Sequence, residues 1–198
     1  IPSFLNYGGF PASACVSVNE EVIHGIPSTK KIIKEGDLVS VDLGINLNGY
    51  FSDMARTFIV NETKEAYKTL CKVTRESLDL GIEAAGKNGA RIQDIGKAVS
   101  HHCSQYGYGV VRDFTGHGVG LAVHEGPEIP NYSAPFLANP RIREGMVLAI
   151  EPMINLGTHK VSILEDNWTV VTRDGLPSAH FEDTVAIAKD GLVILTRG

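Results

Sequence analysis

The stretch LVSVDLGINLNGYFSDMARTF, residues 38–58, decides the fold of this chain. It contains most of two runs rich in strand-forming residues, 38–46 and 51–60, and between these runs lie Asn48 and Gly49. An Asn-Gly pair between two such runs is a strong signal for a two-residue β-hairpin turn. The sequence therefore predicts a hairpin in which Leu47 faces Tyr50.

This turn fixes the register of two acidic residues. If Leu47 faces Tyr50, then Gly44 faces Asp53, and Asp42 lies two residues from Gly44 on the same face of the sheet. Asp42 and Asp53 are then diagonal neighbours, with an open space expected above Gly44. Two carboxylates this close raise each other's pKa unless a cation lies between them. The hairpin therefore predicts a metal site.

Further acids interrupt apolar runs elsewhere. Glu151 lies within MVLAIEPMI and Glu182 within HFEDTVAIA, while His117 lies between glycines in TGHGVG. An isolated buried carboxylate is costly, so several of them together call for compensation. Alone, either hairpin aspartate is as well explained by an exposed sheet face, and one buried acid could be a structural hydrogen-bond acceptor. Together they indicate a dinuclear centre, whose oxygen-rich ligand set suits Mn, Fe or Co better than structural zinc.

The remaining pattern predicts an α+β fold in which helices cover a curved, mainly antiparallel sheet. We expect helices over 61–86 and 92–106, and mostly loop over 118–144. Strands are expected over 16–22 and 147–155, in a hairpin around 168–172, and in two final runs split by Asp190 and Gly191. Without a linker or a repeat, residues 1–198 are expected to form a single catalytic domain.

Composition narrows the classes of partner. The net charge is −5 and no basic cluster occurs, which argues against binding to nucleic acid. No apolar run approaches the roughly 20 residues that cross a bilayer. Three cysteines without a CxxC spacing indicate a reducing compartment, so we expect a cytoplasmic protein. The chain starts at Ile1 without a signal-like segment, and we expect that a leading segment is missing.

Six segments, in order, resemble the type I methionine aminopeptidases of the M24 metallopeptidases: CVSVNEEVIHGIP, VSVDLGINLNGYFSDMARTF, TGHGVG, VHEGP, AIEPMI and DNWTVVTRDGLPSAHFEDTV. The resemblance covers essentially the whole chain. It implies the pita-bread fold and hydrolytic removal of the initiator methionine from nascent polypeptides when the next residue is small. It also implies a leading helical segment and strand that this chain lacks.

The resemblance assigns roles to individual residues. Two divalent ions (Co, Mn or Fe, with Zn or Ni as further candidates) would be held by Asp42, Asp53, His117, Glu151 and Glu182. Asp53 and Glu182 would bridge the ions, and Glu151 would also move the proton of the attacking water. His24 would lie near the scissile nitrogen and His124 near the carbonyl oxygen, both in contact with substrate. The methionine pocket would be lined by Phe4, Tyr7, Phe10, Cys15 and Trp168.

Other interpretations stay open from the sequence. A prolidase or an aminopeptidase P shares the five-ligand pattern, and a non-catalytic binding protein could use the same scaffold. The ribosome is a further expected partner, and we expect a monomer. The remaining histidines are interpreted as surface or packing residues: His101, His102, His159 and His180.

Overall fold

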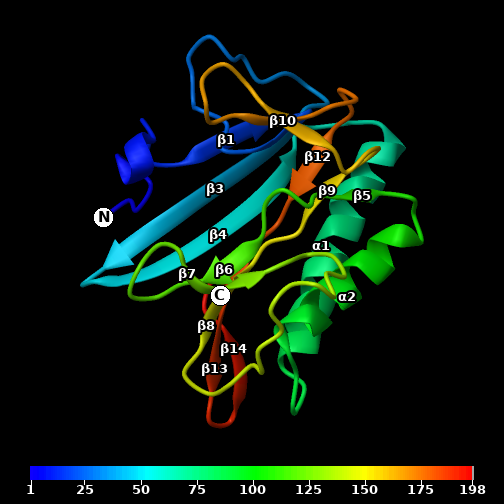
Figure 1. Cartoon of the computed structure of the whole chain (residues 1–198). Helices are drawn as coiled ribbons and strands as arrows, with labels where there is room; N and C mark the ends of the chain where they lie inside the picture. The colour runs from blue at the N-terminus through cyan, green and yellow to red at the C-terminus, as the bar shows by residue number, and fades with distance from the viewer. Residues whose placement is uncertain (198) are drawn as a thin grey trace.

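The computed structural model describes residues 1–197 and confirms the predicted hairpin. Strands β3 (Leu38–Leu47) and β4 (Tyr50–Ile59) pair in antiparallel fashion, and Leu47 faces Tyr50 across the turn. Gly44 faces Asp53, as the turn predicts. Asn48 and Gly49 both have positive φ values, 55° and 89°, which this turn requires. The hairpin extends across one side of the molecule (Figure 1).

The other elements follow in chain order. They are the 3₁₀ helix η1 (Tyr7–Gly9), β1 (Cys15–Val18), β2 (Glu21–Ile23), α1 (Glu65–Ala85), α2 (Ile92–Ser104), β5 (Gly109–Val110), β6 (Gly116–Gly118), β7 (Glu125–Ile129), β8 (Val147–Ile150), β9 (Met153–Asn155), β10 (Val161–Ile163), β11 (Val170–Thr172), β12 (Ser178–His180), β13 (Asp183–Ala188) and β14 (Gly191–Ile194).

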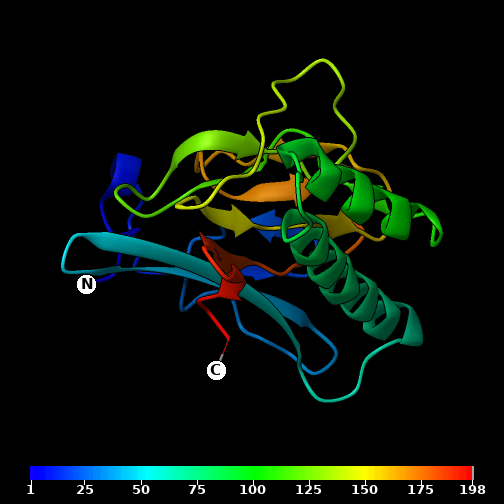
Figure 2. The same cartoon turned by 90° about the horizontal axis from the view of Figure 1, so that it is seen from below.

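The strands form four antiparallel sheets, with the orders β1-β3-β4, β10-β11-β2, β12-β9-β5 and β14-β13-β8-β6-β7. Helices α1 and α2 pack side by side and cover the strands from one side (Figures 1 and 2). Their apolar faces and the inner strands share one core, which includes the fully buried side chains of Leu70, Leu78, Ile92 and Ile95. Within residues 1–197, neither helix combines the length and the apolar character needed to cross a membrane.

Two predicted strands are each divided in the structure, for a local reason. The strand expected over 16–22 divides into β1 and β2 because Asn19 turns the chain with a φ of 55°. Residues 118–144 are mostly loop, as expected, and also contain β7, which pairs with β6. The strand expected over 147–155 divides at Glu151 and Pro152, because proline has no N–H to donate to the ladder. β8 and β9 therefore join different sheets, and Glu151 lies at the crossing point.

Candidate metal centre

One cavity of about 200 Å³ brings together every residue that the sequence nominated for the site. A cavity of roughly 150 Å³ can hold a molecule the size of benzene, so this one has room for a single side chain. Its walls are formed by Phe4, Tyr7, Phe10, Cys15, His24, Asp42, Asp53, His117, His124, Glu151, Trp168 and Glu182. Four of these residues are acids and four are aromatic, the latter being Phe4, Tyr7, Phe10 and Trp168.

The hairpin places the first two acids. Asp42 is 8% exposed and Asp53 is 4% exposed, so neither carboxylate lies on a solvated sheet face. The space above Gly44 is not open as expected, because a Cβ added there would lie 2.0 Å from Ser3 Oγ and 2.9 Å from the Phe4 ring. Glycine is needed here because the N-terminal segment packs directly on the strand, with Ser3 N donating to Gly44 O at 3.0 Å.

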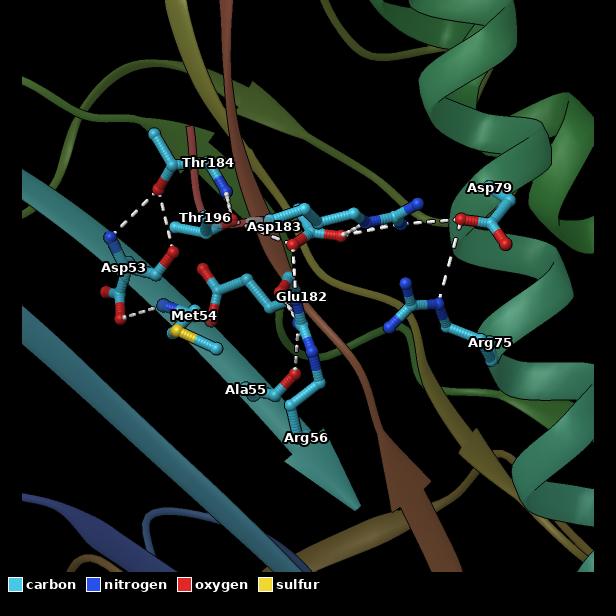
Figure 3. Close-up of polar contacts among 11 residues, drawn as sticks. Asp53, Met54, Ala55, Arg56, Arg75, Asp79, Glu182, Asp183, Thr184 and Thr196 are labelled. Atoms are coloured by element: carbon cyan, nitrogen blue, oxygen red, sulfur yellow. Dashed lines mark hydrogen bonds and ion pairs between the residues drawn. The ribbon is translucent and has the colours of Figure 1, made fainter. Parts of the chain in front are cut away.

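Main-chain contacts fix the spacing of Asp53 and Glu182. Glu182 N donates to Ala55 O at 3.0 Å, which couples the start of β13 to β4. Thr184 strengthens this coupling, since its hydroxyl accepts from Asp53 N at 2.8 Å and donates to Asp53 O at 2.7 Å (Figure 3). Two residues distant in the sequence are thereby held in a fixed relation before any cation binds.

Glycines place His117 against the neighbouring strand. A Cβ on Gly116 would meet Ala149 O at 2.4 Å, and one on Gly118 would meet Gly126 O at 2.3 Å, so only glycine allows this packing. His117 Nδ1 lies 2.9 Å from Gly118 O, and because a carbonyl can only accept, Nδ1 carries the proton. The lone pair of His117 Nε2 is therefore free, and Nε2 lies 3.4 Å from Glu151 Oε1.

Burial dominates the electrostatics of the acids. It raises the pKa of Asp53 from 3.8 to about 7. Burial, followed by repulsion from Asp53 and other acids, raises the pKa of Asp42 and of Glu182 well above their usual values. The pKa of Glu151 is raised in the same way. A group of buried acids with raised pKa values is typical of a functional site.

The donor set fits divalent cations. Asp42 Oδ1 and Glu182 Oε1 are buried without a hydrogen-bond partner among residues 1–197. Ligand atoms of Asp53, His117 and Glu182 all lie within 4.8 Å of one another, and so do those of Glu151, His180 and Glu182. Glu182 belongs to both groups, as a carboxylate shared by two ions would. Carboxylate oxygens with a neutral imidazole are ligands that Mn²⁺ and related ions accept.

Part of the cavity wall is apolar. Phe4, Phe10, Cys15 and Val123 form a small buried cluster against which Trp168 packs. The rings of Phe10 and Trp168 meet edge to face, with centroids 5.2 Å apart. Burial and the nearby carboxylates raise the pKa of the Cys15 thiol, which keeps it neutral. This surface suits a flexible apolar side chain, and sulfur contacts aromatic edges favourably.

Two more histidines border the cavity. His24 has a φ of 58°, a backbone conformation that non-glycine residues rarely adopt and that often marks a functional site. Burial, followed by repulsion from His124, lowers the pKa of His24 from 6.5 to about 4. His124 is more exposed, and its Nδ1 lies 3.0 Å from the Tyr7 hydroxyl. The rings of His117 and His124 are 4.1 Å apart.

The interpretation of His180 as a surface or packing residue missed its place at this centre. His180 is 1% exposed, and its Nε2 lies 3.5 Å from Glu151 Oε2. Burial, followed by repulsion from His24, lowers its pKa from 6.5 to about 3. The sequence did carry a signal, because His180 lies two residues before Glu182 in the same apolar run.

Comparisons with known proteins agree on one family. Residues 4–189 match the model of Metallopeptidase family M24. The chain is 53% identical over 196 residues to "Methionine aminopeptidase" of Clostridium acetobutylicum, covering 99% of this chain and 78% of that protein. It is also similar to the crystal structure of methionine aminopeptidase from Thermotoga maritima, with a TM-score of 0.95, 47% identity, and coverage of 100% of this chain and 78% of that one.

A prolidase is a more distant match. The prolidase from Pyrococcus furiosus has a TM-score of 0.72 and 30% identity, with coverage of 93% of this chain and 49% of that one. The similarity in fold therefore extends to a second class of peptidase, while the similarity in sequence is stronger to the first class.

Proposed function

This chain belongs to metallopeptidase family M24, and we propose that it removes the N-terminal methionine from polypeptides by metal-dependent hydrolysis. It has the pita-bread fold of its relatives, and its relatives at about half identity are methionine aminopeptidases. The observation that carries the proposal is the cavity itself, which joins a set of buried carboxylates to an apolar wall sized for one side chain. The lower identity to prolidase, 30%, disfavours that alternative.

We assign the ligands to Asp42, Asp53, His117, Glu151 and Glu182, with Asp53 and Glu182 shared between two ions. The ions, when bound, would supply an acidified water and polarise the peptide carbonyl. The buried, partly unpartnered carboxylates support this assignment. The number of ions and their identity (Co, Mn or Fe, with Zn or Ni as alternatives) are part of the proposal.

The remaining roles follow from the position of each side chain. Glu151 can accept a proton at a carboxylate oxygen, since its raised pKa brings proton exchange towards neutral pH. Tyr7 can donate its hydroxyl proton to His124 Nδ1, which leaves the Nε2–H of His124 to stabilise the developing oxyanion. His24, kept neutral by its low pKa, lies beside the aromatic wall and Trp168, where we place the scissile nitrogen.

We also propose where the reaction takes place and on which substrates. We expect the substrates to be nascent chains with a small second residue, presented near the ribosome to a monomeric enzyme in the cytoplasm. The three cysteines are free and buried, which agrees with a reducing compartment.

Peptide hydrolysis tests this function. Protein loaded with Mn²⁺ or Co²⁺ should cleave Met-Ala-Ser with a kcat/KM at least about 100-fold above that for Leu-Pro or Ala-Pro, because the apolar pocket selects the first side chain. Met-Phe-Ser should be a poor substrate. A chelator should abolish cleavage, and added Mn²⁺ should restore it. Faster cleavage of the Xaa-Pro dipeptides would favour the prolidase alternative, and no cleavage by metal-loaded protein would favour a binding protein.

A further inference from the structure

His180 is held rigidly behind the metal centre. It ends β12, and its main chain is fixed on both sides by Thr57 of β4. His180 N donates to Thr57 Oγ1 at 2.8 Å, and the same hydroxyl lies 2.9 Å from His180 O. Thr57 is itself anchored by Ser40 Oγ at 2.8 Å. The hairpin that carries Asp42 and Asp53 therefore also fixes the position of His180.

The imidazole of His180 has no polar partner that would explain its burial. The ring is 1% exposed, and neither Nδ1 nor Nε2 has a hydrogen-bond partner among residues 1–197. Burying an imidazole without partners is unfavourable, and a purely packing position would be better filled by an apolar side chain. The ring therefore needs an explanation at the site that it faces.

The nearest candidate partner is Glu151. Its two carboxylate oxygens lie between two imidazoles, since Oε1 is 3.4 Å from His117 Nε2 and Oε2 is 3.5 Å from His180 Nε2. His117 Nε2 presents a lone pair because Nδ1 donates to Gly118 O. The two oxygens of Glu151 are therefore not equivalent. Oε1 lies beside the free lone pair of His117 Nε2, whereas Oε2 lies beside the buried ring of His180.

We propose that His180 is a positioning residue for Glu151, donating its Nε2–H to Oε2 so that Oε1 stays directed at the cation beside His117. A small shift of the carboxylate would close the present 3.5 Å separation to a shorter hydrogen bond, since such contacts are often long in the unliganded state. Carboxylate ligands held by a second group in this way bind metal more tightly, because the ligand is already oriented. This inference rests on the metal centre of the proposed function.

Two substitutions separate a hydrogen-bond donor from a space-filling group. His180→Gln keeps an N–H donor at a similar reach, whereas His180→Leu fills the space without a donor. Titration with Mn²⁺ by calorimetry should show that His180→Leu weakens the binding of one ion by about 10- to 100-fold, while His180→Gln stays within about threefold of the original protein. His101→Leu, a change of an exposed histidine on α2, serves as the matched control and should bind as the original does.

Stability of the metal-free protein supplies a second readout. A merely structural histidine would lower the urea midpoint of metal-free protein when replaced, whereas His180→Leu should leave the midpoint unchanged or raise it. Unchanged Mn²⁺ affinity in His180→Leu would overturn the inference, and so would equal losses in His180→Leu and His180→Gln.

Proton NMR of the Co²⁺ protein tests the alternative of direct ligation. One hyperfine-shifted, solvent-exchangeable imidazole N–H is expected, from His117. A second such signal that disappears in His180→Gln would mean that His180 binds the ion itself, which would overturn its role through Glu151. By contrast, original protein that takes up no Mn²⁺ at all would refute the metal centre rather than the role of His180.

Discussion

Glu182 and Asp183 are adjacent in the sequence, yet their buried carboxylates have opposite surroundings (Figure 3). Asp183 is 0% exposed and accepts from Arg56 at 2.5 Å, Arg197 at 2.7 Å and Thr196 at 2.7 Å. Glu182 is 2% exposed, and its Oε1 has no partner among residues 1–197. The fold thus neutralises one buried acid with arginines, whereas an oxygen of its neighbour has no protein partner among the described residues.

The pKa values express the same contrast. Burial would raise the pKa of Asp183, but hydrogen bonds from Arg197, Arg56 and Thr196 hold it below its usual value. Burial and repulsion from other acids raise the pKa of Glu182. The two regions are also joined, because Arg56 binds both the carboxylate of Asp183 and the carbonyl of Glu182. The neutralised acid therefore helps to hold the backbone of Glu182, the residue proposed as a shared metal ligand.

Removing a carboxylate from the candidate metal centre should have the largest effect. Asp42→Asn should cost one ion and lower kcat/KM for Met-Ala-Ser by at least about 100-fold, because losing a ligand weakens metal binding more than losing a group that only orients a ligand. Metal-free Asp42→Asn should be as stable as the original or more stable, since one like charge is gone. Elemental analysis and urea unfolding in chelator measure both effects.

Asp190→Asn is the matched control for Asp42→Asn, because Asp190 is exposed in the turn between β13 and β14. It should change neither metal content nor turnover. Full metal occupancy in Asp42→Asn would show that the unpartnered Oδ1 of Asp42 is not a ligand.

The complementary change removes Asp183, the buried acid that arginines neutralise. Asp183→Asn should lower the free energy of unfolding by about 3 kcal/mol, since it leaves two arginines without their buried partner. The loss should be the same with and without Mn²⁺, unlike the effect of Asp42→Asn. Urea unfolding under both conditions measures it.

A surface ion pair provides the control for this loss. Glu62→Gln removes the exposed partner of Lys68, 2.9 Å away, and should leave stability unchanged. A loss in Asp183→Asn that appears only in the metal-loaded protein would mean that Asp183 acts through the metal centre rather than through the arginines.

The contrast also shows what could be predicted from the sequence. The hairpin register followed from Asn48 and Gly49 alone, because a two-residue turn leaves no freedom in the pairing. The position of Asp42 and Asp53 on one face then followed from strand geometry. Local rules of this kind do not depend on distant segments, and they were confirmed.

Contacts between distant segments could not be predicted in this way. The packing of Ser3 against Gly44 and the clamp of Thr57 on His180 join residues far apart in the chain, so no pattern within either segment indicates them. The arginine partners of Asp183 are equally distant in sequence. The burial of His180 beside Glu151 was therefore not predicted from the sequence, whereas its neighbour Glu182 was nominated for the site and lines the cavity.

The dependence of stability on pH distinguishes the two regions further, because its sign differs between them. In metal-free protein, the pKa of Asp53 rises from 3.8 to about 7, so between these values the folded state keeps a proton that the unfolded chain has released. The contribution of Asp53 to stability therefore falls as pH rises through this window. The pKa of Asp183 is lowered, so its contribution is present above 3.8 and is lost as pH falls.

The pH profile of stability for one protein would combine the opposite effects of Asp53 and Asp183 with those of the histidines. The lowered pKa values of the histidines add stability as pH rises from about 4 to 6.5. The difference between the original protein and one variant isolates each acid instead. We therefore subtract the unfolding free energy of each variant, measured in chelator, from that of the original protein. The difference for Asp53→Asn should decrease as pH rises from 4 to 7. The difference for Asp183→Asn should instead decrease only as pH falls. Saturating Mn²⁺ should abolish the pH dependence of the difference for Asp53→Asn, because a cation bound at Asp53 replaces its proton. It should leave the pH dependence of the difference for Asp183→Asn, because the carboxylate of Asp183 is already paired with arginines. A slope of the same sign for both variants would show that the two neighbouring acids are neutralised in the same way.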